Sequence, residues 1–247
     1  MANIRASIMK RINALRHDNI ALIRHGDVRL LLDRRNRLDH KLAGGIYWEW
    51  QLRDRAVQEV KAHRLDLFID AGANLGLYTI DLNLRAGPIE TIAFEPQPDS
   101  YYQLCGNIFA NGLSDHVRAE RAALSAADGT AEMAVDSDSN IHSSLLTRPR
   151  DEARFDRRIE VPLIRFDGHY PIENRRIFLK MDVEGHELEA LEGMRLLLTR
   201  NKGSLQIECG GAEFNNMYKD SNVEVQPEID FVAHAASMGA HAEKASG

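Results

Sequence analysis

Two short polar stretches interrupt apolar segments of this sequence, and both contain residues that could bind a ligand or move a proton. The first is DAGANLG, residues 70–76, and the second is KMDVEGHE, residues 180–187. Glycine lets a ligand approach the backbone without an intervening Cβ and tolerates a positive φ, and Asn is the next most tolerant residue. The first stretch is therefore a candidate binding loop, with contacts expected from Asp70, Gly72, Ala73, Asn74 and Gly76.

Three classes of ligand could use such a loop. A dinucleotide requires the spacing G-x-G-x-x-G, but Asn74 stands at the middle glycine, and the Gly-Lys-Ser/Thr ending of a P-loop is missing. A nucleoside with a zwitterionic amino-acid tail needs an acid for its ammonium group, which Asp70 offers. Glu95 ends the next apolar segment, where a carboxylate can accept hydrogen bonds from both ribose hydroxyls. Together these features predict S-adenosylmethionine as cofactor.

The second stretch carries candidates for acid–base chemistry. If the methyl group of S-adenosylmethionine goes to an alcohol, the transfer requires alignment of oxygen, carbon and sulfur, and the hydroxyl gains from losing its proton during attack. Asp182, at the end of an apolar segment, is the first candidate base, followed by Glu184 and His186. Asp182 could instead orient the cofactor or a loop without proton transfer. Lys180 is expected on the same side of a strand as Asp182, because strand side chains alternate.

Further polar residues are candidates for contact with the methyl acceptor. His142 and Ser144 lie in the polar stretch 137–156, and Glu208 ends a later apolar segment. A solvated surface loop is the alternative reading of His142. Asp, His and Glu side chains could together hold a divalent metal, but no local spacing typical of metal ligands supports this. We therefore predict no metal.

These residues require a scaffold that brings several strand ends to one edge. Apolar, branched segments alternate with helical patterns, which predicts an α/β fold with a mainly parallel sheet covered by helices on both faces. A β-rich excursion is expected over residues 129–166. In such sheets, ligands bind at the carboxyl ends of the strands. Strands are expected at 65–71, 90–96, 117–124, 176–183 and 203–209, with helices at 75–86, 98–111 and 185–200.

Composition limits the class of protein. The chain has 247 residues, 44% of them hydrophobic, and a formal net charge of -6. This suits one α/β domain, and the acidity argues against nucleic acid as the main partner. No apolar run is long enough to span a membrane, the N-terminus is a poor signal peptide, and two cysteines make no disulfide framework. A cytoplasmic location is expected.

The first part of the chain differs in charge from the rest. Residues 1–41 hold ten Lys or Arg and four acids, a balance of +6 that leaves -12 for the remainder. Apolar residues at helical spacing predict a basic amphipathic helix at 4–16, a short strand is expected at 27–33, and a second helix at 46–62. We therefore divide the chain into a basic N-terminal helical segment, 1–45, and a main domain, 46–247. The basic helix either packs on that domain or makes peripheral contact with an anionic membrane.

Five segments occur in the order "FIDAGANLGLYTI", "AFEPQPDSYYQLCGNIFANGL", "AALSAADGTAEM", "LKMDVEGHELEALEG" and "LQIEC". In these segments the chain resembles the FkbM family of S-adenosylmethionine-dependent methyltransferases over about residues 46–210. The resemblance implies a class I methyltransferase (Rossmann-like) fold, with a seven-stranded sheet closed by a C-terminal hairpin. It also implies O-methylation of a sugar, polyketide or other secondary metabolite. By position, the loop at 70–76 would surround the methionine part, Glu95 with Pro96 the ribose, and Ala123 the adenine.

The resemblance fades after Cys209, where the closing hairpin is expected to be shortened. An open sheet edge would be available to a second subunit, so a homo-oligomer is among the expected assemblies. Two other classes remain as alternatives. One is a methyltransferase-like binding or scaffold protein without catalysis, with the basic N-terminal segment as its working surface. The other is a nicotinamide-dependent oxidoreductase, whose phosphate-binding third glycine is absent. The expected partner is a small hydroxyl-bearing molecule, whose identity the sequence does not specify.

Overall fold

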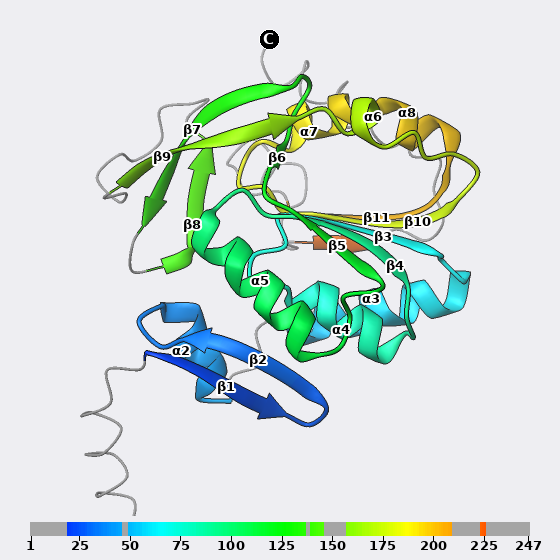
Figure 1. The fold of residues 1–247 in the computed structure, drawn as a ribbon. Coiled ribbons are helices and arrows are strands. Elements are labelled where there is room, and N and C mark those ends of the chain that lie inside the picture. The colour runs from blue at the N-terminus through cyan, green and yellow to red at the C-terminus, as the bar shows by residue number, and fades with distance from the viewer. Residues whose placement is uncertain (1–18, 46–48, 137–138, 146–156, 209–222, 226–247) are drawn as a thin grey trace, which may run out of the picture.

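A six-stranded sheet forms the centre of the protein, with strand order β12-β11-β10-β3-β4-β5. The computed structural model describes residues 19–45, 49–136, 139–145, 157–208 and 223–225 (Figure 1). β12 is antiparallel to β11, and the other neighbouring strands are parallel. The mainly parallel sheet expected from the sequence is confirmed. The strands are β3 (Leu67–Ala71), β4 (Glu90–Phe94), β5 (Val117–Glu120), β10 (Arg176–Met181), β11 (Lys202–Glu208) and β12 (Val223–Val225).

The order of these strands reverses beside β3. The chain moves from β3 to β4 and β5 toward one edge, and then returns to place β10 and β11 on the other side of β3. The loops that follow β3 and β10 therefore leave the sheet side by side. This is the position at which α/β sheets of this kind bind ligands.

Helices cover both faces of the sheet (Figure 1). The alternation of side chains explains this arrangement, because Phe68 and Phe178 pack with α3 and α4, whereas Leu67 and Leu179 pack with α7 and α8. One face carries α3 (Trp50–His63), α4 (Leu77–Arg85) and α5 (Pro98–Ala110), and the other carries α6 (Phe166–His169), α7 (Glu187–Gly193) and α8 (Arg195–Arg200).

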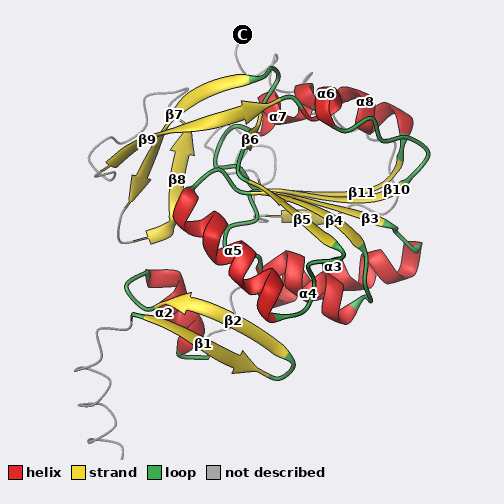
Figure 2. Ribbon diagram, in the orientation of Figure 1, coloured by secondary structure: helices red, strands yellow, loops and turns green. Residues whose placement is uncertain are grey.

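A second sheet, of order β6-β9-β7-β8, stands beside the first (Figure 2). The single strand expected at 117–124 was wrong: β5 ends at Glu120, and Ala123 and Leu124 pair with β9 instead, where both side chains are buried. Part of the polar stretch 137–156 is a strand and not the surface loop considered for His142, because residues 139–145 form β8, which pairs with β7. The strands are β6 (Ala123–Leu124), β7 (Gly129–Asp136), β8 (Ser139–Leu145) and β9 (Arg157–Ile164).

The N-terminal segment contains the short strand expected at 27–33 and a second strand before it that was not expected. Residues 20–33 form an antiparallel hairpin of β1 (Ile20–His25) and β2 (Val28–Asp33), followed by α2 (Arg37–Ala43). Leu30 and Leu32 are both buried and stand two residues apart, which is the spacing of side chains on one face of a strand. The helix expected at 4–16 lies outside the described residues. The helix expected at 46–62 is α3, which begins at Trp50.

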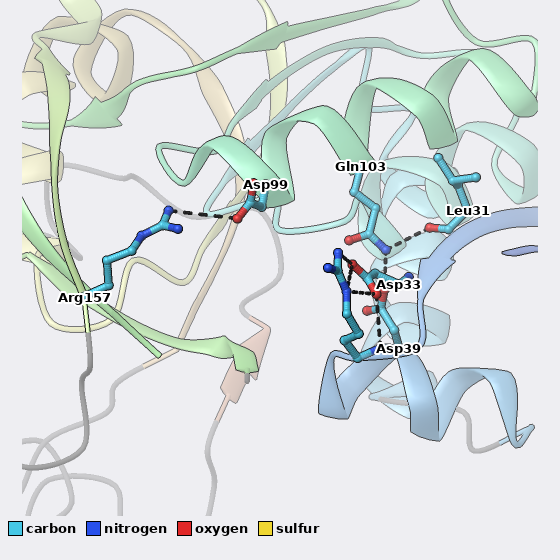
Figure 3. A network of polar contacts seen from close by, with 7 residues as sticks. Leu31, Asp33, Asp39, Asp99, Gln103 and Arg157 are labelled. Carbon is cyan, nitrogen blue, oxygen red and sulfur yellow. Dashed lines mark hydrogen bonds and ion pairs between the residues drawn. The ribbon is translucent and has the colours of Figure 1, made fainter. Parts of the chain in front are cut away.

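Side chains of α5 hold the hairpin in place (Figure 3). Gln103 Nε2 donates to Leu31 O at 2.8 Å, and Asn107 Oδ1 accepts from Leu31 N. Asp39 of α2 accepts from Asp33 N at 2.6 Å. Arg157 of β9 reaches the other end of α5, 4.0 Å from Asp99. The hairpin is thus part of the packed structure around α5.

Candidate active site

A cavity of about 150 Å³ lies where the loops after β3, β4 and β10 meet. Both polar stretches singled out from the sequence contribute to it. Apolar residues of α2, α4, β6 and β7 complete its walls. The lining residues are Leu38, Glu49, Ala71, Gly72, Ala73, Asn74, Leu75, Leu77, Tyr78, Phe94, Glu95, Pro96, Ala122, Ala123, Leu124, Met133, Lys180, Asp182, Val183, Glu184 and His186.

The loop after β3 is fixed by contacts with its neighbours. Gly72 N and Ala73 N both donate to Phe94 O, at 3.0 and 2.9 Å, and Asp182 N donates to Ala71 O at 3.0 Å. Gly72 has a φ of 77°, and a Cβ at this position would lie 1.8 Å from Asp182 O. Both the positive φ and the close contact with Asp182 therefore require glycine at position 72. The close approach binds the two loops to each other.

Asp70 lies behind the cavity and is not among its lining residues. Its side chain is fully buried, Oδ2 accepts from Thr79 Oγ1 at 2.7 Å, and Oδ1 is 3.7 Å from Lys180 Nζ. Burial raises the pKa of Asp70, against the opposing effects of Lys180 and the Thr79 hydrogen bond. The structure thus does not bring Asp70 to the cavity wall as its expected contact with an ammonium group requires.

Lys180 connects the two loops through its ammonium group. Nζ donates to Gly72 O at 2.7 Å and lies 3.5 Å from Asp182 Oδ2. The same atom is 5.5 Å from the centroid of the Tyr78 ring. The expectation that Lys180 and Asp182 share a side of the strand is confirmed. Lys180 thereby fixes the Asp182 carboxylate relative to the loop at 70–76.

Glu95 is buried at the end of β4 and lines the cavity. Its Oε2 accepts from Asn74 N and its Oε1 from Gln97 N, both at 2.8 Å. Burial raises the pKa of Glu95 to about 7, although these two backbone hydrogen bonds lower it. Each carboxylate oxygen has a second lone pair, so Glu95 retains the capacity to accept from two hydroxyl groups.

The three candidate catalytic residues all line the cavity, in different surroundings. The Asp182 side chain is 28% exposed and is the one held by Lys180. Glu184 is exposed and adopts a φ of 56°. His186 is buried, with Nε2 3.1 Å from Ser125 Oγ, and burial lowers its pKa. Asp182 therefore combines access to the cavity with a fixed orientation.

Glu49 lines the same cavity, although it was not among the site residues selected from the sequence. It precedes α3 with a φ of 49°, and its side chain makes no capping hydrogen bond to that helix. Asn74 and Glu184, two other non-glycine residues with positive φ, also line the cavity. Such conformations cost free energy and concentrate at functional sites. In the sequence, an acid before a helix is typical of ordinary helix starts, so the signal was weak.

The remaining sequence-predicted residues divide into three groups. Ala73, Pro96 and Ala123 line the cavity as expected. Gly76 does not line it; this residue directly precedes α4 with a φ of 92°, and a Cβ there would lie 2.6 Å from Leu104 Cδ1. The side chains of His142 and Ser144 in β8, and of Glu208 at the end of β11, lie outside the described residues, so their contact with an acceptor stays a prediction.

Two features are absent from the described residues. No group of three or more His, Cys, Asp or Glu in this part of the chain is arranged to hold a metal ion. None of the helices described above combines the length and apolar character needed to cross a bilayer.

The strand order, the two-sided helical covering and the cavity at the strand ends define a protein of the class I methyltransferase fold. Residues 70–233 match the model of the methyltransferase FkbM domain, and the chain belongs to this family.

The chain is similar to several known proteins. Methyltransferase sdnD of Sordaria araneosa is 29% identical over 153 residues, which cover 51% of this chain and 59% of that protein. The methyltransferase FkbM structure from Methylobacillus flagellatus KT has 18% identity and a TM-score of 0.41, covering 58% of this chain and 32% of that one. The O-methyltransferase structure from Bacillus cereus in complex with SAH has 13% identity and a TM-score of 0.46, covering 81% and 75%.

Proposed function

We propose that this protein transfers a methyl group from S-adenosylmethionine to a hydroxyl oxygen of a small metabolite. The observation that carries the proposal is the meeting of the loop at 70–76, Glu95 and Asp182 on one cavity of a chain in the FkbM family. The family match supports methyl transfer, and the cavity supports the choice of donor and the type of acceptor. A sugar, a polyketide or another secondary metabolite is the expected acceptor class.

The residues of the cavity fit this donor. Glu95 would accept the ribose hydroxyls, and the apolar surfaces of Phe94, Pro96 and Ala123 would flank the adenine ring. The lining contains four acids, Glu49, Glu95, Asp182 and Glu184, and one lysine, which favours a ligand with positive charge. When bound, S-adenosylmethionine supplies an electrophilic methyl group.

The backbone of the loop argues against a dinucleotide cofactor. Gly72 N and Ala73 N donate to Phe94 O, and Asn74 N donates to Glu95. These N–H groups are therefore engaged within the protein, whereas a pyrophosphate needs free N–H donors at this position. This observation favours a nucleoside without phosphate over the nicotinamide alternative.

Asp182 would accept the proton of the attacking hydroxyl at a carboxylate oxygen. The Lys180 ammonium group, 3.5 Å away, orients that carboxylate. Asp182 is partly exposed, so the proton can pass on to solvent. His186 is held by Ser125, and burial lowers its pKa, so we assign it to orienting the acceptor. Alignment by these groups, with removal of the proton during attack, provides the catalysis.

The test combines binding with turnover on the full chain. Calorimetry with S-adenosylhomocysteine should show binding, and NAD, used as the comparison ligand, should show none. Incubation with methyl-labelled S-adenosylmethionine and a panel of hydroxyl acceptors should yield a labelled methyl ether and an equal amount of S-adenosylhomocysteine. Binding without turnover on every acceptor would favour the non-catalytic alternative, and absence of binding would refute the proposal.

A further inference from the structure

A second cavity lies between the hairpin and α2 on one side and α3 and α4 on the other (Figure 1). Its volume is about 460 Å³, whereas the cavity at the strand ends measures about 150 Å³. Sites for small molecules commonly measure about 300–1,000 Å³. The cavity at the strand ends therefore leaves little room for the body of an acceptor beside the donor, and the second cavity has the size of a ligand site.

The two cavities are neighbours that share a wall. Leu77, the first residue of α4, lines both of them. Leu38 and Leu42 stand about one turn apart on α2, and Leu38 lines the cavity at the strand ends whereas Leu42 lines the second cavity. Glu49 and Trp50, adjacent in the chain, divide between the two cavities in the same way. A molecule in the second cavity therefore lies next to the donor.

The walls of the second cavity are mainly apolar. Six of the lining residues have apolar or aromatic side chains, namely Val28, Leu30, Leu42, Trp50, Leu77 and Ile80. Trp50 is 54% exposed, so it stands where the cavity meets solvent. Walls of this kind favour a ligand with an apolar body, because apolar surface of both partners is then removed from water.

The charged residues of the second cavity are paired with one another. Arg53 Nη1 lies 2.6 Å from Asp81 Oδ2, and both side chains are buried. Arg85 forms ion pairs with Asp81 and Asp54. His25 Nε2 lies 3.0 Å from a carbonyl oxygen of α2. Two arginines thus compensate two aspartates, and a charged group of a ligand would be buried without a counter-charge of its own. The lining therefore favours an uncharged ligand.

From these features we propose that the second cavity binds the apolar, uncharged body of the methyl acceptor, whose hydroxyl group reaches past Leu77 toward the donor. The inference rests on the proposed function and narrows the acceptor to a hydroxyl compound with a hydrophobic body. A sugar fits less well, because most of its hydroxyl groups would lose their hydrogen bonds to water against apolar walls. The hairpin and α2 thereby form one side of the acceptor site.

Binding is tested with phenylnaphthylamine, a neutral apolar probe whose fluorescence rises on binding, and with the full chain saturated with S-adenosylhomocysteine. The wild type should bind the probe at one site. Val28→Phe should bind it at least about tenfold more weakly, because the added ring takes up space in the cavity. Leu22→Phe is the matched control, because Leu22 lies on the neighbouring strand, is 60% exposed and does not line the cavity. It should bind like the wild type.

A second variant removes a wall of the cavity instead of filling it. Trp50→Ala should also weaken probe binding, and Phe109→Ala, which removes a 79% exposed aromatic ring of α5, should not. Urea denaturation and the affinity for S-adenosylhomocysteine show that each variant is folded. Absence of probe binding to the wild type, or wild-type binding by both Val28→Phe and Trp50→Ala, would overturn the assignment.

Turnover identifies the bound molecule as the acceptor. In assays with methyl-labelled S-adenosylmethionine, kcat/KM for apolar alcohols such as naphthylmethanol should exceed that for methyl glucoside at least about tenfold. Val28→Phe should remove this preference and keep its affinity for S-adenosylhomocysteine. Equal or higher kcat/KM for the glucoside in the wild type would overturn the acceptor assignment and leave the proposed function standing. A chain that does not bind S-adenosylhomocysteine would refute the proposed function itself.

Discussion

Lys180 of β10 is paired in register with Asp70 of β3, and Nζ lies 3.7 Å from Oδ1. Gln206 of β11 continues the same row, and its Nε2 donates to the Tyr78 hydroxyl at 2.8 Å. Polar side chains thus cross three adjacent strands near their carboxyl ends, beneath α4. Because Lys180 also contacts Gly72 and Asp182, this buried row fixes both loops of the cavity.

Replacement of Lys180 by Met tests the structural role of the row. The variant leaves Asp70 buried without its cation, which costs about 3–5 kcal/mol in the free energy of unfolding. Urea denaturation followed by circular dichroism measures the loss. Lys202→Met, an exposed lysine of the same sheet, is the control and should change stability by less than about 0.5 kcal/mol. The double variant Asp70→Asn/Lys180→Met should recover part of the loss. Equal stabilities of the two lysine variants would contradict the role assigned to Lys180.

Replacement of Gly72 by Ala tests the contact between the two loops. The added Cβ would lie 1.8 Å from Asp182 O, so the loops must separate and ligand affinity should fall by at least about tenfold. Gly87→Ala is the control, because Gly87 also has a positive φ but has no atom within 4 Å of the added Cβ. The Gly87→Ala variant should lose only about 1–2 kcal/mol in the free energy of unfolding, which is the cost of a left-handed backbone conformation for a residue with a Cβ. It should keep its affinity for S-adenosylhomocysteine. Equal affinities in both variants would show that the close approach does not shape the site.

The raised pKa of Glu95 predicts a pH dependence of stability. The folded protein holds the proton of Glu95 up to about pH 7, whereas the unfolded chain releases it near the ordinary glutamate pKa of 4.5. The stabilising contribution is therefore full below the unfolded pKa and is lost as pH rises through about 7. In urea denaturation, the free energy of unfolding of the wild type should fall between pH 4.5 and about 7, relative to that of Glu95→Gln. Parallel pH profiles for the two proteins would contradict the shift.

Ligand affinity should change with pH in the opposite direction. The ionised Glu95 carboxylate is the better acceptor for ribose hydroxyls, so affinity for S-adenosylhomocysteine should rise as pH increases through about 7. In calorimetry on both sides of about pH 7, the affinity of Glu95→Ala for S-adenosylhomocysteine should be lower than that of the wild type and should not change with pH. An unchanged affinity in Glu95→Ala would contradict the ribose assignment.

Replacement of Asp182 by Asn separates binding from chemistry. The amide preserves the shape of the side chain but cannot take the hydroxyl proton, so turnover should fall at least about tenfold with unchanged affinity for S-adenosylhomocysteine. Glu192→Gln, which removes a carboxylate paired with Arg195 at the surface, is the control for loss of charge. Full turnover in Asp182→Asn would remove Asp182 as the base.

Sequence patterns located most of the site because its residues follow strands that are easily recognised. Glu95 and Asp182 stand directly after runs of buried apolar residues, and parallel strands bring such ends to one edge. The burial of Asp70 beside Lys180 could not be predicted from such a pattern. Its burial depends on Lys180 from a distant strand, and local sequence does not show that the two are paired in register. Glu49 was missed because its position depends on how α3 packs.

Several boundaries also depended on tertiary contacts. The helix expected at 185–200 is divided into α7 and α8 at Met194, which follows Gly193, where a Cβ would lie 2.0 Å from the Ser125 carbonyl oxygen. Asp167 then accepts from Leu196 N and Leu197 N at the start of α8. A helical period in the sequence carries no information about a capping residue contributed by another element.

The crystal structure of the full chain with S-adenosylhomocysteine tests the central claim most directly. The account predicts the nucleoside in the cavity at the ends of β3, β4 and β10, with both ribose hydroxyls in hydrogen-bond contact with Glu95 and the sulfur atom facing Asp182. A nucleoside bound at another place, or in this cavity with its ribose away from Glu95, would contradict it.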